Sequence, residues 1–233
     1  MTPSHSHALI LGAGPGLSAS LARLFRTKGL RVTLAARNVD KLAPLCQATG
    51  ARAVACDVSD RRDIARVFET LDEGGAPDVM VYNPSARVRG RITEIDPEGV
   101  ARAVSVSALG AFHAAREAAI RMESQGHGAM LFTGASASVK GYPGSSVFAM
   151  GKFALRGLCQ SLARELHPKG VHVGHFVIDG AIRNPAREAE RPEPGPDAHL
   201  DPDAIAAAYW SFLEQDRSAW AWEIELRPWV ERF

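Results

Sequence analysis

Short apolar runs alternate along the chain with segments whose apolar residues recur every three to four positions. The short runs are typical of buried strands, and the longer periodic segments are typical of helices packed on a sheet. A run near the tail alternates large apolar with polar residues, which also indicates a strand. We therefore expect strands at Ala8–Leu11, Arg31–Ala35, Ala51–Cys56, Asp78–Tyr82, Ala129–Thr133, Val171–Ile178 and Trp220–Leu226.

The periodic segments between these runs predict the helices. The helix after the second strand has Asn38 as its N-cap, and Ser59 or Asp60 caps the following one. The long helical segment before the fifth strand has a break near Val104. The expected helices are Leu17–Lys28, Asn38–Thr49, Asp60–Leu71, Asp96–Gln125, Val147–Leu166 and Asp203–Glu214.

Strands and helices that alternate at these lengths imply a parallel sheet covered on both faces. We expect an α/β fold: one Rossmann-like, doubly wound parallel sheet of about seven strands, forming a single domain over residues 1–233. The segment Arg183–Pro202 holds four prolines and a glycine within residues 185–196. We interpret it as an irregular surface loop that serves as a substrate lid.

Composition and charge exclude several classes of protein. Hydrophobic residues make up 46% of the chain and charged residues 23%, with a formal net charge of +1. This balance gives no bulk electrostatic reason to bind nucleic acid or an anionic membrane. No apolar run approaches the ~18 residues of a membrane span, and the polar start does not resemble a signal peptide. The three scattered cysteines indicate no metal site and favour a reducing, cytoplasmic location.

A glycine-rich turn, Gly12-Ala13-Gly14-Pro15-Gly16-Leu17, joins the first strand to the first helix. Glycines allow close approach of backbone and ligand, and the free N–H groups at the helix start attract phosphate. The turn therefore predicts a dinucleotide site at Gly12, Gly14, Gly16 and Leu17.

The end of the second strand favours NADP(H) over NAD(H). An acidic residue about 20 positions after the glycines would bind the ribose 2′-hydroxyl of NAD. Ala36 occupies that position, and Arg37 and Asn38 follow it. A guanidinium pairs well with a phosphate, so we expect NADP(H) as the cofactor.

These motifs resemble those of the short-chain dehydrogenase/reductase family over nearly the whole chain. Gly12 and Gly16 match the family's glycine motif, with Ser18 in place of its last glycine. The family's Asn-Asn-Ala-Gly motif appears as Tyr82-Asn83-Pro84-Ser85, in which only Asn83 matches. The resemblance implies that Asp57 and Val58 contact the adenine and that the Ile182 backbone meets the nicotinamide carboxamide. It also implies a small-molecule carbonyl or alcohol as the substrate.

The resemblance is weakest at the catalytic residues. The family's Tyr-x-x-x-Lys pair appears as Phe148 and Lys152, so the lysine for the nicotinamide ribose is present but the tyrosine hydroxyl is not. The family's serine falls on Ala135, with the hydroxyls of Ser136 and Ser138 close by in the sequence, and Ser136 is the candidate to replace it. Ser107 takes the place of the asparagine on the central helix.

Two interpretations of this site remain open. The first is an oxidoreductase with a displaced proton donor, for which Tyr142 is the candidate and Tyr82, His113 and Lys152 are further ones. The second is an impaired protein that binds NADP(H) as a redox sensor or scaffold. The sequence leaves open the substrate, the direction of reaction and whether turnover occurs without a tyrosine at position 148.

The resemblance also implies a homodimer or homotetramer. In the family, helices equivalent to residues 105–125 and 146–167 pair across a two-fold axis. Alanines at 114, 115, 118 and 119 permit close approach, and three tryptophans near the tail offer a second contact: Trp220, Trp222 and Trp229.

Overall fold

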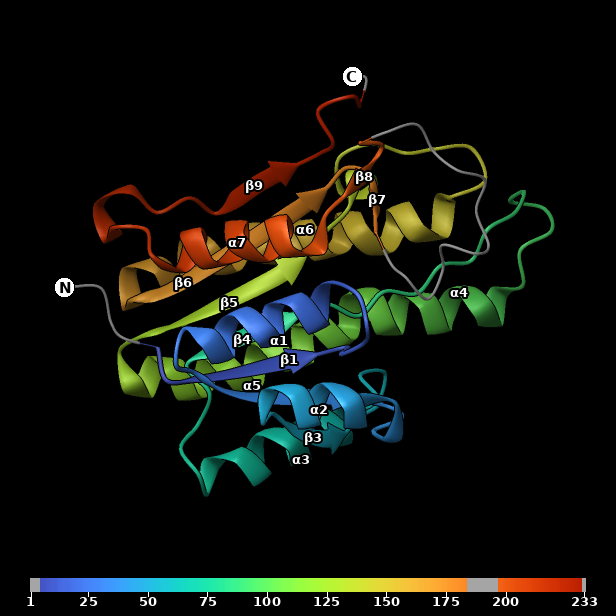
Figure 1. Ribbon diagram of the computed structural model, residues 1–233. Helices are drawn as coiled ribbons and strands as arrows, with labels where there is room; N and C mark the ends of the chain where they lie inside the picture. Colours follow the sequence, from blue (N-terminus) through green and yellow to red (C-terminus); the bar gives the residue numbers. More distant parts are fainter. Residues whose placement is uncertain (1–4, 184–196, 232–233) are drawn as a thin grey trace.

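A seven-stranded parallel sheet forms the centre of the molecule (Figure 1). The computed structural model describes residues 5–183 and 197–231. The strand order is β3-β2-β1-β4-β5-β6-β9, which confirms the predicted doubly wound α/β fold. The strands are β1 His7–Leu11, β2 Arg31–Ala36, β3 Arg52–Ala55, β4 Val79–Tyr82, β5 Gly128–Thr133, β6 Val171–Ile178 and β9 Glu223–Leu226.

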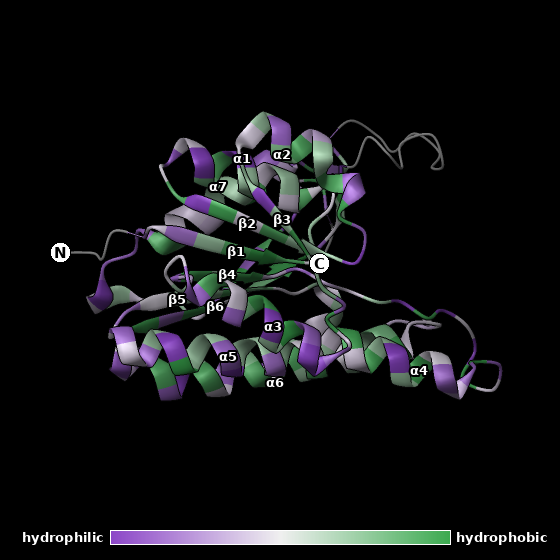
Figure 2. Cartoon of the chain, turned by 90° about the horizontal axis from the view of Figure 1, so that it is seen from below, coloured by the Kyte–Doolittle hydropathy of each residue, from purple (hydrophilic) through white to green (hydrophobic). Residues whose placement is uncertain are grey.

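Helices cover both faces of this sheet (Figure 2). One layer contains α1, α2 and α7, and the other contains α3, α5 and α6, with α4 extending beyond the sheet. The seven helices of the described residues are α1 Leu17–Thr27, α2 Ala43–Thr49, α3 Arg61–Asp72, α4 Pro97–Val104, α5 Gly110–Gln125, α6 Ser146–Leu166 and α7 Pro202–Leu213. Short 3-10 turns lie at η1 Asp40–Leu42, η3 Ser136–Ser138, η4 His167–Lys169 and η6 Arg217–Ala219.

The two-residue period of the strands divides the core into two layers. On β1, Leu9 and Leu11 pack with α3, α5 and α6, whereas Ala8 and Ile10 pack with α1 and α7. All four are fully buried, as expected for a central parallel strand with helices on both sides.

The structure shows where the predicted helices begin and where the long one is interrupted. Asp60, and not Ser59, caps α3, because its carboxylate accepts a hydrogen bond of 2.8 Å from the Arg62 N–H. The Asn38 side chain instead starts the turn η1, and α2 begins only at Ala43. The break predicted near Val104 is a π-helical segment, η2 Ser105–Leu109, between α4 and α5.

Close packing explains where this π turn lies. The Tyr82 hydroxyl of β4 donates a hydrogen bond of 2.5 Å to the Val106 carbonyl oxygen. A Cβ on Gly110, the first residue of α5, would lie 2.4 Å from that hydroxyl and 2.3 Å from the Val58 carbonyl oxygen. The irregular turn and the glycine together bring α5 against the sheet.

The predicted loop at 183–202 is only partly within the described residues. Residues 184–196, which hold its prolines, lie outside them, and the lid therefore stays a prediction. The expectation that the whole segment is irregular is wrong at its end, because β8 His199–Leu200 pairs in parallel with β7 Ala181–Ile182. The cause is local: the proline cluster ends before β8, and Pro202 is already the first residue of α7.

Among the described helices, none is long and apolar enough to cross a bilayer.

Candidate active site

A cleft of about 1550 Å³ opens at the carboxyl ends of the parallel strands. These ends lie on the right in Figure 1, beside β7 and β8. The loops that follow β1, β2, β3, β4, β5 and β6 all contribute lining residues. The cleft thus lies where ligands bind in open α/β sheets.

The glycine turn forms one wall of the cleft. Gly12 has a φ of +75°, and a Cβ there would lie 2.7 Å from the ring of Pro84. Gly14 lines the cleft, and a Cβ there would meet no atom within 4 Å. Gly16 caps α1 with no side-chain hydrogen bond, so the first N–H groups of α1 are left for a ligand. The turn therefore has the space and the donors that a pyrophosphate needs.

The side chain of Asn83, the residue just after β4, holds the turn in place. Asn83 Nδ2 donates to Ser18 Oγ at 2.8 Å, and Ser18 Oγ donates to the Gly12 carbonyl oxygen at 3.2 Å. The Asn83 N–H also bonds to the Leu11 carbonyl oxygen. Asn83 therefore acts as a brace between β4 and the glycine turn, in addition to lining the cleft.

The end of β2 brings basic groups to the same wall. Arg37, Asn38 and Lys41 all line the cleft, and the Arg37 side chain is exposed to it. Facing them after β3, the Asp57 carboxylate accepts hydrogen bonds from the Ser59 hydroxyl at 2.7 Å and from the Ser59 N–H. These bonds, with a smaller contribution from the Arg37 charge, lower the pKa of Asp57. Val58 lines the cleft beside it.

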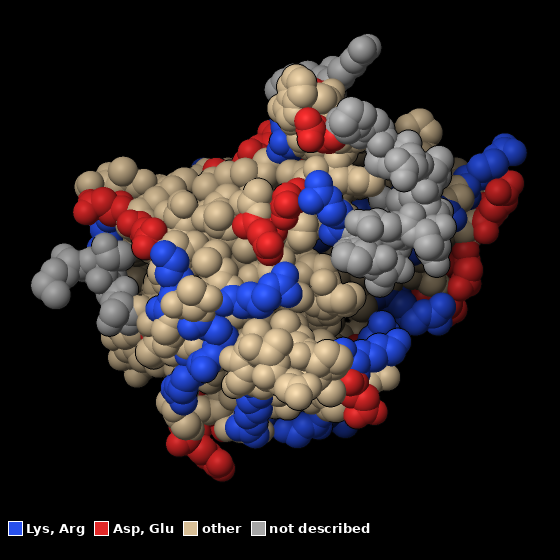
Figure 3. All heavy atoms as spheres, viewed as in Figure 1, with Lys and Arg blue, Asp and Glu red and all other residues tan. Residues whose placement is uncertain are grey.

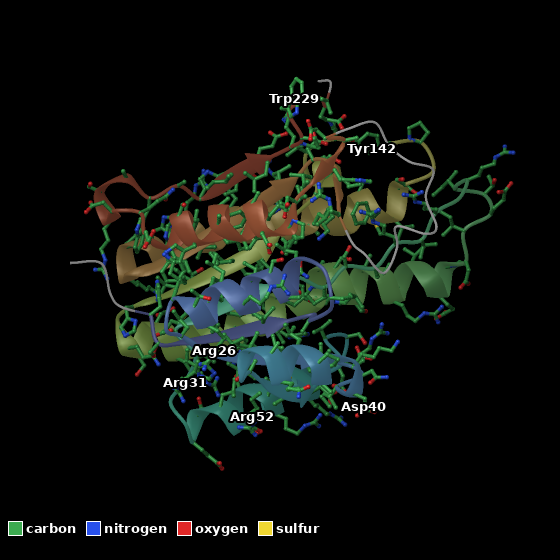
Figure 4. The ribbon with its side chains drawn as sticks, in the orientation of Figure 1. Arg26, Arg31, Asp40, Arg52, Tyr142 and Trp229 are labelled. Carbon is green, nitrogen blue, oxygen red and sulfur yellow. The ribbon has the colours of Figure 1, made fainter. Side chains whose placement is uncertain are left out.

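Not all basic residues near α1 and β2 belong to the cleft. Figure 3 shows Lys and Arg side chains over the lower half of one face, with acidic side chains among them. In Figure 4, Arg26, Arg31 and Arg52 lie toward the amino-terminal ends of β2 and β3, far from Tyr142. Arg26 and Arg31 donate there to backbone carbonyl oxygens, of Thr49 and Gly74 respectively.

Phe148 and Lys152 lie on consecutive turns of α6, but only Phe148 lines the cleft. Lys152 is 2% exposed, and its Nζ donates a hydrogen bond of 2.6 Å to the Thr133 carbonyl oxygen. Burial, together with repulsion from the Arg87 charge, lowers the pKa of Lys152 to about 8. Its ammonium lies 6.0 Å from the centre of the Phe148 ring.

Of the hydroxyls near Ala135, the structure brings Ser136 to the cleft. Ser136 begins η3 and lines the cleft, whereas Ser138 is fully buried and accepts a hydrogen bond from the Ala135 N–H. Ser145, just before α6, also lines the cleft and makes no side-chain capping bond. Ser136 and Ser145 therefore line the same cleft as Phe148.

The remaining candidates divide between cleft and core. Tyr142 lines the cleft with 42% of its surface exposed, and Ile182 lines it from β7. Ser107 is 2% exposed within the π turn, where it accepts a hydrogen bond of 3.4 Å from the Ala86 N–H, and it does not line the cleft. Tyr82 is buried, with its hydroxyl bonded to the π turn, and burial raises its pKa.

His113 stacks edge-on against Phe112 on α5 and does not line the cleft either. The described residues therefore bring together Ser136, Tyr142 and the predicted cofactor contacts from Gly12 to Ile182, and leave Lys152, Ser107, Tyr82 and His113 outside the cleft lining.

Several lining residues were not foreseen from the sequence. Arg87 is the most informative, because its guanidinium carbon lies 4.2 Å from the centre of the Phe148 ring. Lys41 and Ser145 could have been suggested by their place in the sequence, since Lys41 lies three residues after Asn38 and Ser145 three residues after Tyr142. Arg87 carried no such local signal, because its contact with Phe148 joins the loop after β4 to helix α6, 61 residues further along the chain. The other charged residues of the lining that the sequence did not predict are Arg89, Asp179 and Glu231, whereas Arg183, Asp197 and His199 belong to the segment expected as the lid.

Comparison with known proteins agrees with this geometry. The sequence profile described as short chain dehydrogenase matches residues 6–194. The cyclic-di-GMP-binding biofilm dispersal mediator protein of Escherichia coli (strain K12) is 33% identical over 189 residues, which span 79% of this chain and 76% of that protein.

Solved structures show the same fold. A short-chain dehydrogenase from Rhodopseudomonas palustris superimposes with a TM-score of 0.82 at 33% identity, covering 97% of this chain and 100% of that one. A metagenomic short-chain oxidoreductase solved in complex with NADP has a TM-score of 0.83 at 25% identity, covering 99% of this chain and 100% of that one.

Proposed function

The chain belongs to the short-chain dehydrogenase family, and from that premise we propose that it is an NADP(H)-dependent oxidoreductase that interconverts a carbonyl and an alcohol in a small molecule. The observation that carries the proposal is the single cleft that is lined both by the glycine turn and by Ser136, Ser145 and Phe148. A dinucleotide laid along it would reach from Arg37 to Ile182, and the space around Gly14 suits a pyrophosphate.

The basic groups after β2 decide the cofactor in this proposal. Arg37 and Lys41 would bind the 2′-phosphate of NADP(H), and Asn38, Asp57 and Val58 would surround the adenosine. The cofactor, when bound, supplies or takes up a hydride. A relative of the same fold solved with NADP supports this choice.

The chain's own residues would handle the carbonyl oxygen and its proton. Ser136 and Ser145 have hydroxyls in the cleft that can orient the carbonyl, and Tyr142 has a hydroxyl that can give the proton. Phe148, in the position of the family's tyrosine, has no proton to give. A contact of Lys152 with the nicotinamide ribose would use another of its three N–H donors, since one is bonded to the Thr133 carbonyl oxygen.

The alternative, a protein that binds NADP(H) without turnover, is not favoured, because the matched family is one of dehydrogenases. A homodimer or homotetramer stays part of the proposal. It is supported by large apolar side chains exposed on the two helices expected to pair: Leu109, Phe112 and Ile120 beside or on α5, and Met150 and Phe153 on α6.

Cofactor titration tests the proposal. We expect calorimetry to show tighter binding of NADPH than of NADH. Arg37→Glu should weaken the binding of NADPH by about 10- to 100-fold, since it removes a charge-assisted contact with the 2′-phosphate. Arg52→Glu makes the same charge change on β3 outside the cleft lining and should leave both affinities unchanged. Equal affinities of the wild-type protein for the two nucleotides would contradict the assignment.

A further inference from the structure

A lysine and a tyrosine meet at the edge of the cleft, just before α6. Lys140 and Tyr142 lie on the loop between η3 and α6 (Figure 4 labels Tyr142). The Lys140 Nζ is 5.8 Å from the centre of the Tyr142 ring, and the ammonium interacts with the Tyr142 hydroxyl. Tyr142 lines the cleft, whereas Lys140 does not. The loop therefore places a cation beside the hydroxyl that the proposed function uses as its proton donor.

The ammonium is held by a carboxylate from another part of the chain. Lys140 Nζ donates a hydrogen bond of 3.2 Å to Asp179, which follows β6 and is 4% exposed. The Asp179 N–H in turn donates to the Leu226 carbonyl oxygen of β9 at 2.8 Å. Because this carboxylate is buried and fixed by the sheet, it restricts the long, flexible side chain of the lysine and thereby places its charge.

Backbone hydrogen bonds connect the loop to the other hydroxyls of the site. The Lys140 N–H donates to the Ser136 carbonyl oxygen at 3.0 Å, and the Ser145 N–H donates to the Tyr142 carbonyl oxygen at 3.1 Å. Ser136, Tyr142 and Ser145 all line the cleft. The three hydroxyls of the proposed site and the Lys140 ammonium therefore belong to one hydrogen-bonded segment.

Lys140 keeps its charge over the pH range in which a tyrosine ionises. The hydrogen bond to Asp179, followed by the interaction with Tyr142, raises the pKa of Lys140 above its ordinary value of 10.5. Tyrosine side chains ordinarily ionise at about pH 10. An ammonium close to a phenolate stabilises it, because an opposite charge within about 4 to 6 Å favours the charged form.

The other charges described around Asp179 are in ion pairs. Arg227, just after β9, is 3.8 Å from Asp179 and also contacts Glu225. Arg183, just after β7, pairs with Asp201 at 3.2 Å. Asp179 thus serves two cations, and one of them, Lys140, interacts with Tyr142.

From this arrangement we propose that Lys140, held by Asp179, is a positioning residue that supports Tyr142 as the proton donor, in place of the hydroxyl that Phe148 lacks. The inference rests on the proposed function and deepens it. In the reducing direction the hydride joins the carbonyl carbon, and the C=O π pair moves to oxygen. The Tyr142 O–H bond breaks as its proton joins that oxygen. The phenolate left behind lies beside the Lys140 ammonium until a proton from solvent restores the hydroxyl.

The ultraviolet absorbance of the phenolate tests the pair without substrate or cofactor. The chain has three tyrosines, and burial raises the pKa of both Tyr82 and Tyr209. The first ionisation in an alkaline titration should therefore report Tyr142, and Tyr142→Phe should remove it. We expect Lys140→Met to move the midpoint of this first step upward by about 0.5 to 1 pH unit, as for the loss of one nearby charge in contact with water.

Two further variants separate the charge from the structure of the loop. Lys140→Arg keeps the cation and should keep the wild-type midpoint. Lys169→Met is the matched control, because it removes an exposed lysine that also bonds to a carboxylate, that of Glu123 at 2.9 Å. This control should leave the midpoint unchanged.

Turnover then shows whether the reaction uses the pair. With NADPH and carbonyl compounds, Lys140→Met should lower kcat by about three- to tenfold, in proportion to the lost acidity of the donor, while KM for NADPH stays within about threefold. Lys140→Arg should recover most of kcat, since the cation is retained.

A midpoint that does not move in Lys140→Met, or that moves as far in Lys169→Met, overturns the proposal. A midpoint that moves while kcat stays at the wild-type value overturns the role in proton transfer. If the wild-type protein neither binds nor consumes NADPH, the proposed function fails. In that case the absorbance titration still decides whether Lys140 acts on Tyr142, so the two failures can be told apart.

Discussion

Lys152→Met should stabilise the protein at neutral pH. Lys152 is fully buried on α6, and burial lowers the pKa of its ammonium from the ordinary value of 10.5 to about 8. At pH 7 the folded protein therefore holds a charge that its surroundings disfavour. Methionine has a similar length and no charge, so the substitution removes this cost and retains most of the packing.

The size of the effect follows from the two pKa values and one hydrogen bond. The difference between 10.5 and about 8 corresponds to roughly 3 kcal/mol, at about 1.4 kcal/mol per tenfold change in ionisation. Loss of the hydrogen bond to the Thr133 carbonyl oxygen lowers the stability of the variant by about 1 to 2 kcal/mol and so offsets part of this gain. We expect the free energy of unfolding at pH 7 to rise by about 2 kcal/mol.

The advantage of the variant should disappear as the pH rises. Below about pH 8 Lys152 is protonated in both the folded and the unfolded chain, so the wild-type protein carries the full cost. Between about 8 and 10.5 the unfolded chain holds a proton that the folded protein has released, and wild-type stability rises with pH relative to the variant. The two proteins should reach equal stability at roughly pH 9.5.

Urea denaturation of both proteins at pH 7 and pH 9.5, followed by tryptophan fluorescence, measures this difference. Lys28→Met, at an exposed lysine just after α1, corrects for the change in overall charge. The reasoning is refuted if Lys152→Met lowers the stability at pH 7, or if its effect is the same at both pH values.

Two further predictions concern the glycine turn and the proton donor. Gly12→Ala should lower the melting temperature and abolish NADPH binding, because its Cβ would lie 2.7 Å from Pro84. Gly14→Ala should keep the wild-type melting temperature and only weaken NADPH binding, because its Cβ would meet no atom within 4 Å. An equal fall of the melting temperature in the two variants, measured in a thermal scan, would contradict this. Phe148→Tyr should raise the rate of NADPH consumption with carbonyl compounds by about 10-fold or more, whereas Phe153→Tyr, on an exposed part of α6, should not change it; an unchanged rate in the first variant would show that a hydroxyl at position 148 does not reach the reacting oxygen.

The order of elements could be predicted because each signal is local. A buried parallel strand needs an apolar run, and the helix that follows needs one apolar stripe and a cap. The predictions shifted where a neighbour decides the boundary. The Asn38 side chain accepts a hydrogen bond from the Asp40 N–H at the start of the turn η1, so it does not cap a longer helix. At the start of α3, the Asp60 carboxylate accepts a hydrogen bond from the Arg62 N–H.

The substrate end of the cleft could not be predicted in the same way. Whether Ser136 or Ser138 faces the cleft depends on the phase of one 3-10 turn, which no periodic pattern records. Lys152 had the spacing of a ribose contact, yet its ammonium is drawn to the Thr133 carbonyl oxygen of β5. The contact of Arg87 with Phe148 requires the loop after β4 to meet helix α6, and only the folded chain brings them together.

The departures from the family's motifs fall into two physical kinds. Around the glycine turn they compensate one another: Ser18 replaces a glycine but bonds to Asn83, and Pro84 fits against Gly12 because that residue has no Cβ. These changes leave the shape of the cofactor wall intact. At α6 the proposed replacement of the family's tyrosine by Phe148 would remove a hydroxyl from the cleft. Since the first kind preserves a shape and the second alters a reacting group, substitution of Phe148 should change the rate while leaving the affinity for NADPH unchanged.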